Sequence, residues 1–131
     1  MNARGLILFV HGSRDPRWAE PFRRVCDLVA MRAPQLSVAL AYLESATPDL
    51  EQAVAALVAG GARSIRIVPL FFGRGSHLRD DLPQKIDDAR RRFSDVAFEV
   101  TETAGESDGV VEALAAFALH APARADDVNA T

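Results

Sequence analysis

Three side chains that bind metals and transfer protons stand at equal intervals along the chain. They are His11, Glu44 and His77, and each is separated from the next by 33 residues. Each follows an apolar run typical of a buried strand, and 33 residues are about what one strand, one helix and their connections occupy. The carboxyl ends of parallel strands share one edge of a sheet, at a strand spacing of about 4.8 Å. We therefore expect the three side chains to converge on one point at that edge.

Two imidazoles and one carboxylate suit a divalent ion of cobalt, iron, nickel or zinc. Three protein ligands leave coordination positions open, as a site with a working metal requires. Each residue alone also fits a plainer interpretation, because a single histidine after a strand is more often a loop residue and Glu44 could be a solvated charge. The pattern alone leaves both interpretations open.

Arginines lie near both histidines, and a serine precedes His77. Arg14 and Arg17 follow His11, while the neighbours of His77 are Arg74, Ser76 and Arg79. Planar guanidinium groups suit carboxylate or phosphate, and the N–H groups of a helix N-terminus bind anions. Surface arginines are common, so this feature alone is a weak indication of an anionic ligand.

Alternating strands and helices are predicted to position these residues. Apolar runs predict strands over 5–10, 37–43, 65–72 and 96–101. The β-α-β-α-β-α-β-α order predicts an α/β fold with three layers (αβα) and a four-stranded parallel sheet in the flavodoxin-like order 2-1-3-4. We expect one domain over 1–120 and a disordered tail over 121–131.

Helical periodicity and capping signals set the expected helices. They start at Pro16, at Thr47-Pro48, near Arg79 and after Gly105. The first and last helices each carry an apolar face, comprising Phe22, Val25, Cys26 and Val29 in the first and Val110, Leu114, Phe117 and Ala118 in the last.

Composition excludes several classes of protein. The 131 residues are 49% apolar and 25% charged, which is ordinary for a soluble globular protein, and the net charge of −3 argues against nucleic acid as a partner. One cysteine excludes an internal disulfide and a cysteine-rich metal cluster.

The first apolar run is too short for a signal peptide and no run reaches membrane length, so we expect a cytoplasmic protein that binds no membrane.

Familiar nucleotide and hydrolase motifs are absent from the sequence. The stretch at 73–78 begins like a dinucleotide fingerprint, but Leu78 occupies the position of the third glycine. There is no G-x-S-x-G nucleophile elbow and no P-loop. A histidine phosphatase would have Arg before His11, where this chain has Val10. A phosphate-ester hydrolase that uses His11 stays as a distant alternative.

Three segments together carry a family resemblance. They are H-G-S-R-D-P at 11–16, A-Y-L-E at 41–44 and V-P-L-F-F-G-R-G-S-H-L-R-D-D-L-P at 68–83. The combination resembles the short sirohydrochlorin cobaltochelatases, which belong to the class II, ATP-independent tetrapyrrole chelatases. The resemblance extends from Gly5 to about Leu119. Gly73-Arg74 replaces residues that are more apolar in the family, and Ser76 stands where a second glycine is common.

The resemblance implies a chelatase-like fold, a homodimer and a lyase that inserts Co²⁺, or else Fe²⁺ or Ni²⁺, into sirohydrochlorin for cobalamin or sirohaem biosynthesis. The metal is then a substrate, and no tightly bound cofactor is expected. His11, His77 and Glu44 become the implied metal ligands and proton acceptors, and Phe71 and Phe72 belong to the core or line the cleft. The substrate's eight carboxylates are assigned to Arg14, Arg17, Arg74, Ser76 and Arg79. A non-catalytic metal or tetrapyrrole carrier with the same site is the alternative.

Overall fold

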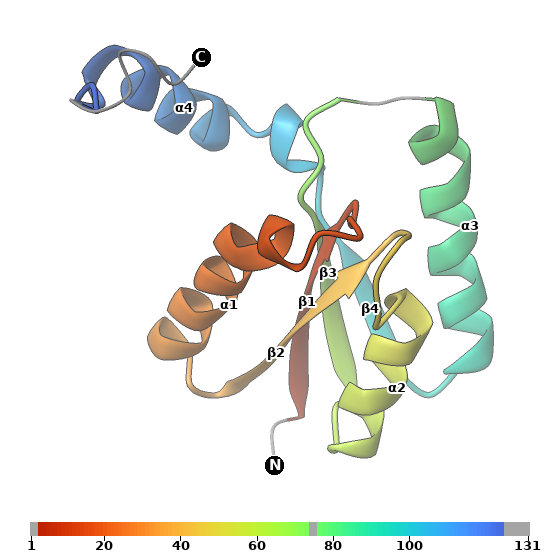
Figure 1. The fold of residues 1–131 in the computed structure, drawn as a ribbon. Helices are drawn as coiled ribbons and strands as arrows, with labels where there is room; N and C mark the ends of the chain where they lie inside the picture. The colour runs from red at the N-terminus through yellow and green to blue at the C-terminus, as the bar shows by residue number, and fades with distance from the viewer. Residues whose placement is uncertain (1–2, 74–75, 125–131) are drawn as a thin grey trace.

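Four parallel strands form one sheet at the centre of the molecule (Figure 1). The computed structural model describes residues 3–73 and 76–124, with the backbone alone over 76–80. The strands are β1 (Arg4–Val10), β2 (Leu36–Tyr42), β3 (Ser64–Pro69) and β4 (Ala97–Val100), in the order β2-β1-β3-β4. All neighbouring strands are parallel. The predicted fold class and strand order are confirmed.

The main core lies between the sheet and two helices. Side chains alternate across a strand, and Ile7 and Phe9 of β1 point to the same face as Ile65 and Ile67 of β3. All four are at most 1% exposed. Helices α2 (Leu50–Ala59) and α3 (Ser76–Arg92) cover this face, and the candidate ligands emerge at the carboxyl end of the sheet.

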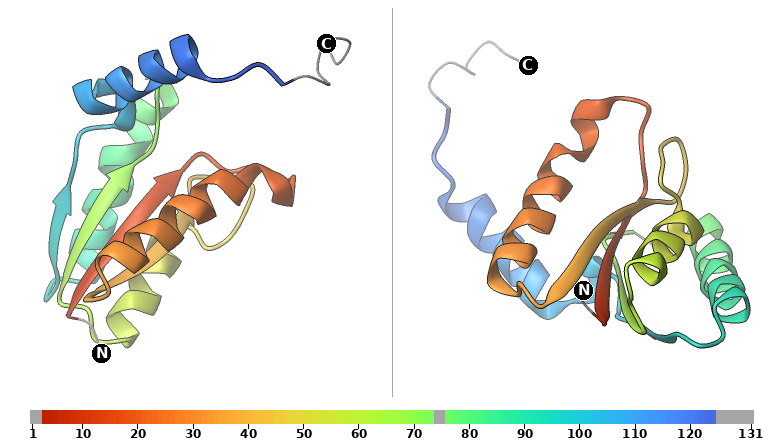
Figure 2. Two further views of the ribbon diagram at one scale, coloured as in Figure 1. Left: turned by 90° about the vertical axis from the view of Figure 1, so that its left-hand side faces the viewer. Right: turned by 90° about the horizontal axis from the view of Figure 1, so that it is seen from below.

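The opposite face of the sheet carries α1 (Glu20–Arg32), as the view from below shows in Figure 2. A 3₁₀ helix, Pro16–Ala19, precedes α1 and is capped by Asp15. The predicted helix start at Pro16 is therefore correct, but the first turn is 3₁₀ and not α-helical. Of the predicted apolar face, Phe22, Cys26 and Val29 are half-buried, but Val25 is exposed. The expectation that Val25 is buried was wrong, because α1 packs mainly against β2 and Val25 stays 40% exposed.

Two other helix starts differ from the sequence prediction. Helix α2 begins at Leu50 instead of Thr47-Pro48, because Asp49 and Gln52 form a reciprocal capping box that satisfies the first free N–H groups. Helix α3 begins at Ser76 instead of near Arg79, which places His77 in its first turn and not in a loop before it. Helix α2 ends at Ala59, and Gly60 is its C-cap residue.

The last helix, α4 (Asp108–His120), follows a short 3₁₀ helix (Ala104–Glu106) and projects away from the sheet (Figures 1 and 2). Its predicted apolar face exists, but none of its residues is buried. Within the described part of the chain, no helix combines the length and apolar character needed to cross a membrane. The predicted disordered tail, 121–131, lies mostly outside the described residues.

Candidate functional site

His11 and Glu44 meet at the carboxyl edge of the sheet. His11 directly follows β1, and Glu44 follows β2 after one intervening residue, Leu43. Nε2 of His11 lies 2.9 Å from Oε1 of Glu44, and more than half of each side chain is exposed to solvent. The sequence prediction that these two residues converge is confirmed, and the pair is open to a ligand from outside.

The main chain holds the two residues in register. The N–H of Leu43 donates to the carbonyl of Val10 (2.8 Å), and the N–H of Glu44 donates to the carbonyl of His11 (3.0 Å). Main-chain hydrogen bonds between the two segments therefore continue to His11, one residue past β1, and to Glu44, two residues past β2. Gly12 makes this approach possible, because it has a φ of +103° and a Cβ there would lie 1.9 Å from the carbonyl oxygen of Glu44.

The spacing of the pair suits a metal ion. Two ligand atoms that each lie about 2.1 Å from a metal and subtend a right angle are about 3.0 Å apart. The observed Nε2–Oε1 distance is 2.9 Å. An ion could therefore take both atoms as neighbouring ligands with little movement of either side chain. Among the described side chains, no group of three His, Cys, Asp or Glu residues is arranged for a metal.

Phe71 supports the imidazole from the direction of β3. Its ring meets that of His11 edge to face at a centroid distance of 6.4 Å, and it meets Phe9 in the same manner at 5.8 Å. Phe71 is buried, whereas the neighbouring Phe72 is 60% exposed. The sequence left open whether these two residues belong to the core or line the cleft. Phe71 belongs to the core, and Phe72 is exposed and can contact a ligand.

A pocket of about 360 Å³ adjoins the pair. It is lined by His11, Leu43 and Glu44 from the strand ends and by Asp81 and Lys85 from α3. Sequence reasoning missed Asp81 and Lys85. The signal that could have found them is their spacing, because positions 77, 81 and 85 recur every four residues and fall on one face of a helix. Position 77 therefore lies on the same face of α3 as Asp81 and Lys85, which line the pocket one and two turns further along the helix.

The other predicted residues around His77 are not described in the same detail. The side chains of Ser76, His77 and Arg79 lie outside the described residues, and so does Arg74 entirely. What the backbone does give is the position of His77 in the first turn of α3. Its role as a ligand stays a prediction.

Arg14 and Arg17 follow His11 but do not line this pocket. Arg17 is turned to Asp15, with its Nη2 3.1 Å from Oδ2 of that carboxylate. The hydrogen bonds from the Arg17 guanidinium and from its main-chain N–H lower the pKa of Asp15. Among the residues that line this pocket, Lys85 is the cation.

The CbiX family model matches residues 5–120. The chain belongs to the CbiX family. A sirohydrochlorin cobaltochelatase of Saccharolobus solfataricus is 31% identical over 101 residues, which cover 74% of this chain and 77% of that protein. A protein of the same name from Methanosarcina acetivorans is 30% identical over 79 residues, covering 60% of this chain and 61% of the relative.

Solved structures have the same fold. The crystal structure of a protein from Marinobacter aquaeolei VT8, described as a CbiX protein of cobalamin (vitamin B12) biosynthesis, has a TM-score of 0.77 and 29% identity, over 88% of this chain and 94% of that one. SirB of Bacillus subtilis, solved with Fe³⁺, has a TM-score of 0.73 at 22% identity. That match covers 93% of this CbiX chain but 49% of SirB, so the chain corresponds to about half of the larger protein.

Proposed function

We propose that this CbiX protein inserts a divalent metal ion into sirohydrochlorin without ATP, with Co²⁺ as the first candidate and Fe²⁺ or Ni²⁺ as the others. The observation that carries the proposal is the contact between His11 and Glu44, in which Nε2 of the imidazole lies 2.9 Å from Oε1 of the carboxylate. Two relatives named sirohydrochlorin cobaltochelatase support the substrate class.

The reaction exchanges two pyrrole protons for one metal ion. Sirohydrochlorin gives up two N–H protons, the metal takes their place on the four nitrogens, and the two protons leave to the protein or to water. His11 and Glu44 bind the incoming ion as neighbouring ligands, and His77 is the proposed third ligand. As the metal passes to the macrocycle, the ligand atoms of these residues become free to accept protons.

The substrate's carboxylates need cations around the site. Lys85 is placed for this task in the pocket that contains His11 and Glu44. We assign to the same task the residues expected from the resemblance, which are Arg14, Arg17, Arg74, Ser76 and Arg79. Arg17 would have to leave Asp15 to take part, because the two are hydrogen-bonded.

Acid is expected to inhibit the enzyme. A metal binds the neutral imidazole and the ionised carboxylate, so protons compete with the metal for both ligand types. Insertion and metal affinity should therefore fall together as the pH is lowered. A loss of insertion with unchanged metal binding would instead point to protonation of the substrate.

An anaerobic spectroscopic assay tests the proposal directly. Purified protein is mixed with sirohydrochlorin and with Co²⁺, Fe²⁺ or Ni²⁺ in turn, and each rate is compared with the uncatalysed rate. We expect acceleration with at least one metal, and at least a hundredfold loss in His11→Ala and His77→Ala, since each removes a ligand. Glu44→Gln is expected to weaken Co²⁺ binding at least tenfold.

His120→Ala is the matched control, because this third histidine is exposed at the end of α4 and away from the strand ends. It is expected to keep the wild-type rate. Stoichiometric binding of sirohydrochlorin without acceleration by any metal would contradict the proposal and favour the carrier. Hydrolysis of a generic phosphate ester that is lost in His11→Ala would favour the hydrolase.

A further inference from the structure

Metal insertion needs a proton acceptor that the metal does not already occupy. A pyrrole nitrogen that still carries its proton has no electron pair in the ring plane, so that proton must leave before the nitrogen can bind the metal. Until then the ion is held by His11 and Glu44. Oε2 of Glu44 is a poor acceptor in that interval, because an ion on Oε1 withdraws electron density from the whole carboxylate. The first proton therefore needs another base in the same pocket.

Asp81 lines the pocket of the His11–Glu44 pair from the side of α3. The pocket has a volume of about 360 Å³, and Asp81 is exposed in it. Among the described side chains, Asp81 does not complete a three-residue metal group with the pair. Its carboxylate thus lies in the pocket but outside the coordination sphere that His11 and Glu44 offer.

The other lining residues cannot take this proton. Leu43 has no group that accepts one, and the ammonium group of Lys85 is a donor without a free electron pair. His11 and Glu44 are engaged with the ion. Of the five described residues that line the pocket, Asp81 is the base that remains.

Helix α3 fixes this carboxylate one turn from position 77. Residues four apart on a helix have Cβ atoms about 5–6 Å apart, so Asp81 lies beside position 77 on the face toward the strand ends. Ile86 and Ala89, which are 5% and 1% exposed, anchor the same helix in the core. With His77 as the proposed third ligand, Asp81 lies next to the ion's position, where the macrocycle nitrogens can reach it.

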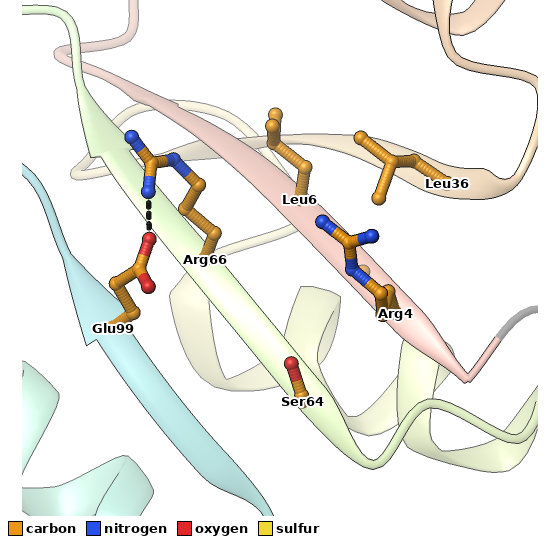
Figure 3. A pocket seen from close by; sticks show the side chains of 7 residues that line it. Arg4, Leu6, Leu36, Ser64, Arg66 and Glu99 are labelled. Carbon is orange, nitrogen blue, oxygen red and sulfur yellow. Dashed lines mark ion pairs between the residues drawn. The ribbon is translucent and has the colours of Figure 1, made fainter.

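Pocket size alone does not identify a reacting carboxylate. A larger pocket, of about 440 Å³, is lined in part by the first residues of β1, β2 and β3, which are Arg4, Leu36 and Ser64 (Figure 3). Its carboxylate, Glu99, is paired with Arg66, and its described lining contains none of the candidate metal ligands. The smaller pocket differs because two candidate ligands share it with a third acidic side chain.

We propose that Asp81 accepts the first pyrrole proton during metal insertion, an inference that rests on the proposed function and adds a residue to it. The N–H bond breaks, its electron pair stays on nitrogen and binds the metal, and the proton goes to a carboxylate oxygen of Asp81. The second proton goes to His11 or Glu44 once the metal has left them. Both protons then pass to water, so two protons are exchanged for one divalent ion.

Single-turnover insertion under anaerobic conditions tests this role, because product release cannot mask the chemical step. In Asp81→Asn we expect the rate to fall about a hundredfold, within the usual contribution of a positioned proton acceptor. Calorimetry should give affinities for Co²⁺ and for sirohydrochlorin within about threefold of the wild type, since Asp81 holds neither of them. Lys85→Met should show the opposite pattern, with weaker sirohydrochlorin binding and little change in rate.

Chemical rescue distinguishes a proton acceptor from a structural residue. Asp81→Ala leaves room for a small carboxylate, so sodium formate should raise its rate about tenfold or more, whereas sodium chloride at equal ionic strength should not. Asp81→Glu should retain more activity than Asp81→Asn because it keeps the carboxylate. Asp87→Asn is the matched control, since Asp87 is an exposed residue of α3 that pairs with Arg90 and does not line the pocket. It is expected to keep the wild-type rate.

Circular dichroism verifies that each variant is folded. A wild-type rate in Asp81→Asn, a parallel loss of its Co²⁺ affinity, a rate loss in Asp81→Ala that formate does not reverse, or an equal loss in Asp87→Asn would each overturn this role of Asp81 and leave the proposed function intact. A wild type that inserts no metal would instead overturn the proposed function, and the inference with it.

Discussion

Substitution of Gly12 by alanine tests whether the backbone positions the candidate site. Two effects act at this position. An L-residue at positive φ costs about 1–2 kcal/mol, and Gly12 has a φ of +103°. The new Cβ would also lie 1.9 Å from the carbonyl oxygen of Glu44, so the two backbones must separate by about 1.5 Å to reach ordinary contact.

That separation breaks the hydrogen bond between the N–H of Glu44 and the carbonyl of His11, at a cost of about 1 kcal/mol. The free energy of unfolding is therefore expected to fall by about 2–3 kcal/mol. Metal ligands must be held within about 0.5 Å of their productive positions. We accordingly expect at least tenfold weaker Co²⁺ binding in folded Gly12→Ala.

Urea denaturation followed by circular dichroism measures the first effect, and calorimetric titration with Co²⁺ measures the second. Gly109→Ala is the control, because Gly109 lies in α4 and a new Cβ there would lie 3.8 Å from Ser107 Oγ, which is ordinary contact. It should be neutral or stabilising, by up to about 1 kcal/mol. A Gly12→Ala protein with wild-type stability and Co²⁺ affinity would refute the reasoning.

Two further predictions concern stability and reactivity. Asp49→Ala removes the N-cap of α2 and is expected to lower the free energy of unfolding by about 1 kcal/mol in urea denaturation, whereas Asp49→Asn retains most of it; equal losses in both variants would contradict the capping role. Burial, and to a smaller extent the charge of Asp27, raises the pKa of the Cys26 thiol. Since the thiolate is the reactive form, iodoacetamide at pH 8 should alkylate Cys26 several-fold more slowly in the folded protein than in urea, and equal rates would speak against this environment.

The strands and their order were predictable from the sequence because buried parallel strands are continuous apolar runs. The 33-residue interval was informative for a related reason: one repeated β-α-β unit brings equivalent positions to the same edge. His11 and Glu44 are in contact for this reason. Helix starts were less predictable. Two start signals stand side by side before α2, Thr47-Pro48 and the Asp49–Gln52 capping box, and only the capping box forms hydrogen bonds to the first N–H groups of the helix.

Long-range features were beyond the sequence prediction. The apolar face of α4 was recognised, yet periodicity says that a helix has an apolar face and not which molecule covers it. Lys85 was missed because its importance depends on how α3 packs beside the strand ends. The role of Gly12 depends on a backbone contact with a segment 32 residues away, which no local pattern reveals.

Main-chain hydrogen bonds beyond β1 and β2 fix where the two metal-donor side chains stand, whichever amino acids carry them. The N–H of Glu44 and the carbonyl of His11 are linked through main-chain atoms, which every amino acid except proline supplies in full. Positions 11 and 44 can therefore exchange oxygen, nitrogen and sulfur donors while the frame stays fixed. Softer donors favour softer ions, so metal preference in this fold can change by single substitutions without any rebuilding of the sheet.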